Sequence, residues 1–149
     1  MVNIDILSSL LACKANQHNF YKLWNATDLG DKEYIATNKD TPNNILVKLS
    51  TNEDNLVREF VADNPSTPIE ILRKLSTDED IWVRKFVAQN PSTPIDILEK
   101  RSNDASRIIR ESVAGNLSTP IETLRKLSND ENPAIRVIAS ENIANRKAK

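Results

Sequence analysis

The sequence repeats arginine at a fixed interval, and these are the residues whose type and spacing could do chemistry. The row, whose successive members are 26 positions apart, consists of Arg58, Arg84, Arg110 and Arg136. If the row lies on one face, its guanidinium groups could follow phosphates or acidic peptide groups. Each arginine also lies six positions after a polar residue: Asn52, Asp78, Asp104 and Asp130. Because a buried arginine needs a partner, we favour a structural ladder paired within or between neighbouring units.

Residues that could carry catalysis or bind a metal are few. His18 is the one histidine and Cys13 is the one cysteine. Zinc usually takes four nitrogen or sulfur ligands, so this pair cannot complete a zinc site. The sequence has no glycine-rich phosphate loop, and its carboxylates recur where helices are expected to begin. We therefore predict no enzyme activity, no catalytic residues, no metal site and no cofactor.

The composition limits the class of protein further. Of 149 residues, 39% are hydrophobic and 28% are charged, which is typical of a folded soluble protein. The 20 basic and 21 acidic residues nearly balance, which argues against a dedicated nucleic-acid-binding protein. No apolar run approaches ~18 residues and no signal peptide is recognisable. A lone cysteine is typical of a reducing compartment, so we expect a cytoplasmic location and no membrane partner.

Thr-Pro recurs at positions 41, 67, 93 and 119, so the chain repeats itself every 26 residues. A period of this length is typical of a solenoid. We expect two short helices in each unit. The first would begin at Thr-Pro, with threonine as the capping residue, proline at the first helical position and an acidic residue completing a capping box. The second would follow a capping residue: Asp54, Asp80, Ser106 or Asn132. Each unit closes on an asparagine that suits a left-handed helix end: Asn64, Asn90, Asn116 or Asn142.

Helices this short are unstable alone, but stacked units bury one another's apolar faces. The predicted fold is therefore all-α: a right-handed α-solenoid of about four 26-residue two-helix repeats plus a degenerate N-terminal capping repeat. We divide the chain into an N-terminal cap and degenerate repeat at 1–40, four helical repeats at 41–142, and a fraying C-terminal tail at 143–149.

The repeat unit resembles the leucine-rich repeat variant family of bacterial proteins. Residues 78–98 carry the pattern D-x-D-x-x-V-R-x-x-V-A-x-N-P-S-T-P-x-x-x-L, and the resemblance covers 41–142 well and 15–40 weakly. It implies a right-handed superhelix of alternating α- and 3₁₀-type helices, without catalytic residues, that serves as a HEAT-like binding scaffold. Some members of the family hold an iron–sulfur cluster in a cysteine-rich N-terminal segment, which Cys13 alone cannot supply.

A few residues depart from the repeat and are candidates for binding a partner. Trp82 occupies a position filled elsewhere by Leu56, Ile108 and Ala134, and is either an interface anchor or a gap filler. The third repeat has Arg101 in place of leucine and Ser112 in place of Phe60 or Phe86, which marks a functional site or drift. The last helix is unusually apolar around Val137. The candidate partner-binding residues are Trp82, Arg101, Arg107 and Val137.

Two functions fit these patterns. The first is a non-enzymatic helical-repeat scaffold that mediates protein–protein interaction, with another protein as its partner and self-association through the C-terminal repeat as a further expectation. The alternative is a nucleic-acid-binding solenoid that uses the arginine row and a lysine row. Near-zero net charge favours the protein-binding scaffold over the nucleic-acid-binding solenoid. We interpret the lysine row as a solvent-exposed stripe.

Overall fold

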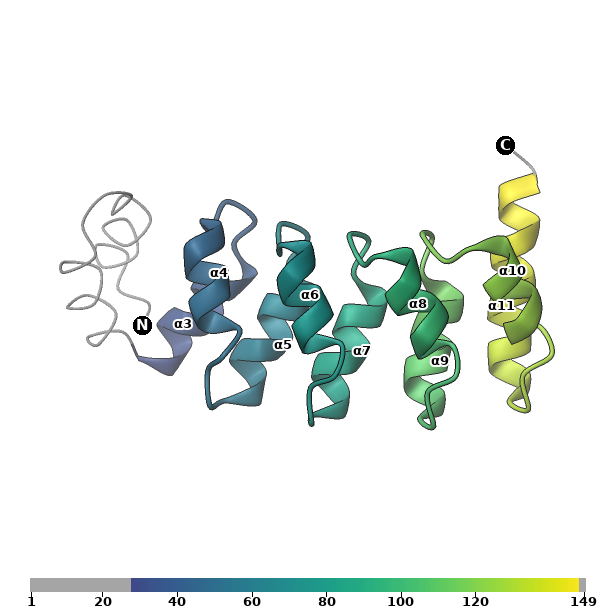
Figure 1. Ribbon diagram of the computed structural model, residues 1–149, viewed down its shortest axis with the longest axis horizontal. Coiled ribbons are helices and arrows are strands. Elements are labelled where there is room, and N and C mark those ends of the chain that lie inside the picture. Colours follow the sequence, from purple (N-terminus) through teal and green to yellow (C-terminus); the bar gives the residue numbers. More distant parts are fainter. Residues whose placement is uncertain (1–27, 148–149) are drawn as a thin grey trace.

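The computed structural model describes residues 28–147, and every regular element in that range is an α-helix. Helix pairs follow one another along an elongated array, as Figure 1 shows. The expectation of an all-α solenoid is confirmed. The expectations for Cys13 and His18 lie outside the described residues, as do residues 1–27 of the predicted N-terminal cap and degenerate repeat.

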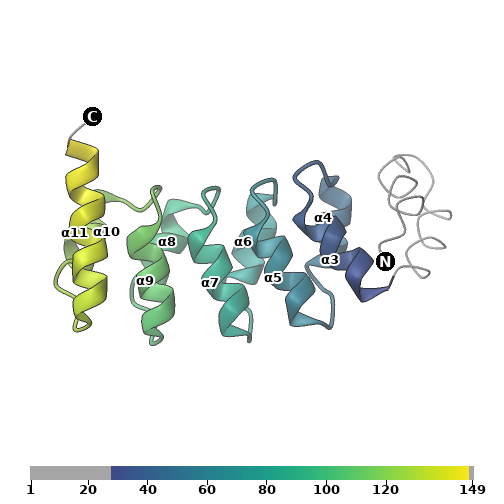
Figure 2. The ribbon, with the colours of Figure 1, turned by 180° about the vertical axis from the view of Figure 1, so that it is seen from behind.

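The helices form two rows. The longer helices are α3 (Leu29–Thr37), α5 (Asn55–Asp63), α7 (Ile81–Gln89), α9 (Arg107–Gly115) and α11 (Pro133–Lys147). The shorter helices are α4 (Asn43–Leu49), α6 (Ile69–Leu75), α8 (Ile95–Arg101) and α10 (Ile121–Leu127). Each longer helix contacts the next longer helix, and Figure 2 shows this row from its own side. We call this side the long-helix face and the opposite side the short-helix face.

The apolar core lies between the two rows and runs the length of the array. One cluster of buried side chains extends from Ile35 to Ile97 and a second from Ala88 to Ala139. Each short helix contributes one fully buried leucine at the same position: Leu46, Leu72, Leu98 and Leu124. The core is thus shared between neighbouring repeats, which is why a single 26-residue unit cannot stand alone.

The short helices begin differently from the expectation. Proline, not threonine, is the N-cap residue, and no side chain caps these helices. The threonine hydroxyl instead donates backwards, as from Thr119 Oγ1 to the Val113 carbonyl at 2.6 Å. The threonine backbone N–H is also occupied, because Thr119 N donates to Asn116 O. The predicted capping box therefore does not form, and threonine secures the end of the preceding long helix.

The implied alternation with 3₁₀ helices is also wrong for the described repeats. In α6, Leu72 N donates to Pro68 O at 3.1 Å, which is the α-helical spacing. Ile71 N donates to the same carbonyl at 2.9 Å and Thr77 N donates to Lys74 O at 3.2 Å, so 3₁₀-type bonds occur only where the helix begins and ends. The seven-residue helices are α-helices with a tightened start.

The long helices begin as the sequence predicts. Asp80 Oδ1 accepts from Trp82 N at 2.7 Å, Asp54 and Asn132 accept in the same way, and α11 starts at Pro133. Ser106 is the exception, because its side chain makes no capping bond to α9.

The asparagine that closes each long helix does not adopt the left-handed conformation. Asn90 has φ −62° and ψ 127°, and no described residue other than glycine has positive φ. Its side chain reaches into the preceding repeat, where Nδ2 donates to Ala62 O at 2.7 Å and Asn64 O at 2.9 Å. Its Oδ1 accepts from Ser92 N at 2.9 Å. Extended backbone is needed here because it directs the amide along the array.

The same amide bridge recurs at every junction between described repeats. Its members are Asn64, Asn90, Asn116 and Asn142, all buried, and we call them the asparagine ladder. A serine two residues later adds a second link, as when Ser92 Oγ donates to Pro65 O at 3.0 Å. Because both donors reach back one repeat, the loops are held in a fixed register.

Helix α11 continues through residue 142 to Lys147, where we expected a fraying tail. Arg146 explains the extension. Its Nη1 donates to Thr119 O at 2.7 Å, its Nη2 to Leu117 O at 2.6 Å, and its Nε to Asn142 Oδ1 at 3.0 Å. Leu117 O is the register equivalent of Pro91 O, which accepts from Ser118. Arg146 therefore occupies the Leu117 carbonyl, whose equivalents Pro65 O and Pro91 O accept from a loop serine of the next repeat.

We predict that Asn90→Ala lowers the free energy of unfolding by about 2–4 kcal/mol, because the buried Ala62 carbonyl and the Ser92 N–H lose their side-chain partner, and Asn64 O keeps only the Thr67 N–H. Urea denaturation measures the loss. Asn44→Ala is the matched control, since Asn44 is exposed on α4, and it should change the free energy by less than about 0.5 kcal/mol. Equal small losses for both variants would contradict the structural importance of the ladder.

Candidate functional site

The arginine row forms ion pairs between repeats at two junctions. Arg58 Nε and Nη2 donate to the two carboxylate oxygens of Asp78 at 2.9 and 3.0 Å. Arg110 binds Asp130 in the same two-point geometry at 2.8 and 3.1 Å. In both arginines Nη1 donates to two carbonyls of its own repeat, which for Arg58 are those of Asn52 and Glu53. These guanidinium groups are used within the fold.

The ion pairs change the protonation equilibria of their members. Burial alone would raise the pKa of the Asp78 carboxyl, but hydrogen bonds from Arg58 and from the Asp80 backbone outweigh burial, and the pKa is lowered. The hydrogen bond from Arg110 lowers the pKa of Asp130 despite its burial. The pKa values of both arginines are raised, first by the hydrogen bonds to these carboxylates. All four groups are held in their charged forms.

Arg84 corrects the pairing that the six-residue spacing indicated. Its Nη1 donates to the backbone carbonyls of Asp78 and Glu79, at 2.7 and 2.9 Å, and not to the Asp78 carboxylate. The acid that an arginine pairs with comes from the next repeat, twenty residues on. For Arg84 that acid would be Asp104, which Arg101 holds instead at 3.0 Å. Arg136 likewise donates to two backbone carbonyls, and no repeat follows it in the described chain.

Arg101, a candidate for partner binding, lies largely beneath the surface. Its side chain is 14% exposed and pairs with Asp104, while its Nε–H is buried without a hydrogen-bond partner in the described structure. Leucine occupies the equivalent position in the other repeats. The substitution thus changes which arginine neutralises Asp104, and it does not offer a charge to a partner.

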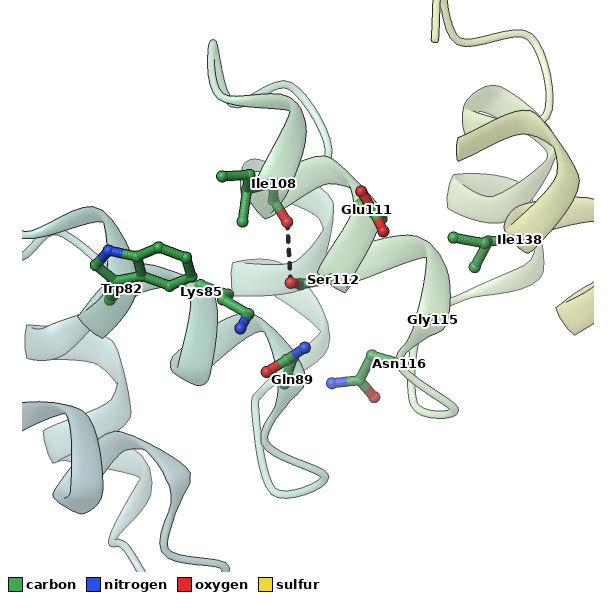
Figure 3. A pocket seen from close by; sticks show the side chains of 9 residues that line it. All are labelled: Trp82, Lys85, Gln89, Ile108, Glu111, Ser112, Gly115, Asn116 and Ile138. Atoms are coloured by element: carbon green, nitrogen blue, oxygen red, sulfur yellow. Dashed lines mark hydrogen bonds between the residues drawn. The ribbon is translucent and has the colours of Figure 1, made fainter. Parts of the chain in front are cut away.

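The long-helix face has a groove across α7, α9 and α11 with a volume of about 520 Å3. We call it the α9 groove. It is lined by Trp82, Lys85, Gln89, Ile108, Glu111, Ser112, Gly115, Asn116 and Ile138. Figure 3 shows Trp82 and Ile138 on opposite sides of Ser112. A groove of this size is within the range of natural ligand sites.

Two small residues of the third repeat create the groove. Ser112 takes the place of Phe60 and Phe86, which pack against the core. Gly115 takes the place of Gln89. A Cβ atom at Gly115 would meet only Ile138 Cγ2 at 3.9 Å, so glycine leaves open space rather than relieving a clash. The departure at Ser112 was recognisable in the sequence, whereas the contribution of Gly115 was not.

Trp82 is positioned at the mouth of the groove by the start of α7. Its side chain is 45% exposed, so it does not simply fill a gap in the core. Lys85 Nζ lies 4.9 Å from the ring centres of both Trp82 and Phe86, a cation–π arrangement that covers part of both rings. The exposure supports the interpretation of Trp82 as an interface anchor.

The remaining candidates lie outside the groove. Arg107 is the first residue of α9 and is exposed. Val137 on α11 is 54% exposed, but its apolar neighbours Ile135 and Ala139 are fully buried. Ile138 is partly buried and packs against the core. Part of the apolar face that the sequence predicted at the C-terminal end is thus covered, while Val137 and Ala134 are exposed.

The described residues offer little for other chemistry. Residues 28–147 contain no group of three or more His, Cys, Asp or Glu side chains that could hold a metal ion. Within the same range, no helix is long and apolar enough to cross a lipid bilayer.

Comparisons with known proteins agree with this description. Residues 56–80 match the family model described as leucine rich repeat variant. A solved structure described as a leucine-rich repeat variant with a novel repetitive protein structural motif superposes with a TM-score of 0.66 at 20% identity. The match covers 95% of this chain and 62% of that chain, so this chain spans less than two thirds of the length of the solved one. No curated protein matches the sequence. The resemblance seen in the repeat unit is confirmed, and the fold is that of a helical repeat scaffold.

We predict that Arg58→Ala destabilises the protein more than Arg84→Ala. The first leaves the buried Asp78 carboxylate without its cation, at a cost of about 3 kcal/mol, whereas the second removes only bonds to carbonyls and should cost about half as much. Urea denaturation of the two variants gives the comparison. A larger loss for Arg84→Ala would mean that the pairing between repeats is not the one described.

Proposed function

We propose that this protein is a non-enzymatic scaffold that binds another protein through its long-helix face. The observation that carries the proposal is the α9 groove, with the half-exposed Trp82 at its mouth. Aromatic side chains beside a concave site supply much of the binding energy in protein interfaces. Many polar side chains at the junctions are used within the array, whereas Trp82 on this face stays exposed beside the groove.

Charge distribution favours a protein partner over a nucleic acid. Arg58 and Arg110, which could have followed phosphates, are held by Asp78 and Asp130. On the long-helix face, the register position of Lys85 is acidic in three other repeats, at Glu33, Glu59 and Glu111. Phosphate groups would be repelled by these carboxylates. A cytoplasmic location in a bacterium is part of the proposal, and it rests on the family resemblance and the single cysteine.

The proposal predicts that Trp82→Ala weakens binding to the partner by at least about tenfold, the effect of losing an interface anchor. Affinity capture with mass spectrometry identifies the partner, and calorimetry measures its affinity for both proteins. Ile95→Ala is the matched control, because Ile95 is 56% exposed on the short-helix face. The control should bind as the wild type does.

Two results would contradict the proposal. Equal weakening by both substitutions, or by Ile95→Ala alone, would place the site on the other face. Binding of single- or double-stranded nucleic acid that falls steeply with salt would indicate phosphate contacts instead. Light scattering on the purified chain accompanies the measurement, because self-association through Val137 would appear there as a dimer.

A further inference from the structure

We propose that the α9 groove receives an aromatic side chain, of phenylalanine size, from a partner peptide in which a basic residue is close to the aromatic one. This inference rests on the proposed function and names the chemistry of its partner. The occupant is a peptide segment of another protein.

The shape of the groove follows from a side chain that the repeat normally supplies. In the first and second repeats, Phe60 and Phe86 lie partly buried on the long-helix face and pack against the core. In the third repeat the same position is Ser112, so a space next to α9 that a phenyl ring fills elsewhere is open. A partner's phenyl group can restore the packing that the chain itself omits.

The floor of the groove suits an apolar side chain although it contains polar residues. Ser112 Oγ donates to Ile108 O at 2.9 Å, the bond drawn in Figure 3. Asn116 is used by the asparagine ladder, with Nδ2 donating to Ala88 O and Asn90 O and Oδ1 accepting from Ser118 N. Because these polar groups already have partners, covering them with a phenyl ring leaves no donor or acceptor newly unsatisfied.

The walls and the rim specify the neighbours of that ring. Trp82, Ile108 and Ile138 supply apolar surface, and the indole offers edge or face contacts to a second aromatic ring. Lys85 is placed over Trp82 and Phe86. Glu111 lines the groove, is half-buried and makes no ion pair with any described residue. Its carboxylate is therefore complementary to a lysine or arginine beside the inserted ring.

The test is selection of binders to the immobilised full chain from a display library of random peptides. We expect enrichment of peptides with one aromatic residue and a lysine or arginine near it. Affinities are then measured by fluorescence anisotropy for the most enriched peptide and for a copy in which alanine replaces the aromatic residue. The copy should bind at least about tenfold more weakly, since the ring is the anchor.

Ser112→Phe is the decisive variant, because it fills the groove with the residue of the first and second repeats and should preserve the fold. It should weaken the peptide at least about tenfold while leaving the thermal midpoint unchanged or higher. Gly115→Gln places the residue of the second repeat at the edge of the groove. It replaces Ser112→Phe in the binding test if Ser112→Phe does not fold. Glu111→Lys should weaken the same peptide and shift the selection towards acidic neighbours. Ile95→Ala on the short-helix face should change nothing.

The inference is wrong if no peptide is enriched, if the enriched peptides lack an aromatic residue, or if the folded groove-filling variants bind them as the wild type does. If the partner no longer binds Trp82→Ala but still binds Ser112→Phe, the proposed function is supported. The α9 groove is then excluded as the site that receives the aromatic side chain. A partner that is retained with both variants would remove the long-helix face as the site.

Discussion

The side-chain amide of one asparagine in each repeat is the interaction on which the rest of the structure depends. Its Nδ2 donates to two carbonyls of the preceding repeat, and its Oδ1 binds an N–H of its own loop, as for Asn90. Carbonyls at a helix end have no partner within the helix, and here they are buried between repeats. Because the same amide reaches both carbonyls at each described junction, a change in the 26-residue spacing would leave buried groups unsatisfied.

Other contacts follow the same geometry and use most of the remaining polar side chains at the junctions. Arg58 and Arg110 reach forward to an acid of the next repeat, and Ser66, Ser92 and Ser118 reach back to a loop carbonyl. At the C-terminal end, Arg146 binds the carbonyls of Leu117 and Thr119. Residues that bind a partner must therefore come from positions that no junction uses. On the long-helix face those positions include Trp82 of the second repeat and Ser112, where the third repeat departs from the first two.

The period and the composition were enough to predict the helix pairs, the shared core and the start of the long helices. Local capping rules failed at Thr-Pro and at the closing asparagine, because both side chains are used for contacts that a single repeat does not contain. Thr119, the first residue of the fourth unit, bonds to the last helix of the third, and Asn116 bonds to the unit before its own. The arginine spacing predicted pairing within or between neighbouring repeats, and the pairing found at Arg58 and Arg110 is between repeats, since Asp78 faces Arg58 and not Arg84. Both Ser112 and Gly115 are needed to open the α9 groove, but only Ser112 departs from a residue pattern that can be recognised in the sequence.

Loops between helices are usually the first part of a protein to exchange their amide hydrogens, since they open locally. In this protein the amides of Ser92 and Ser118 donate to the asparagine ladder, in loops that are tied to the preceding repeat. Native-state hydrogen exchange followed by NMR tests this directly. The account predicts that these two loop amides exchange as slowly as the helical amide of Ala88, by opening of the whole array. Exchange of the loop amides orders of magnitude faster than that of Ala88 would show that the ladder does not hold the repeats together.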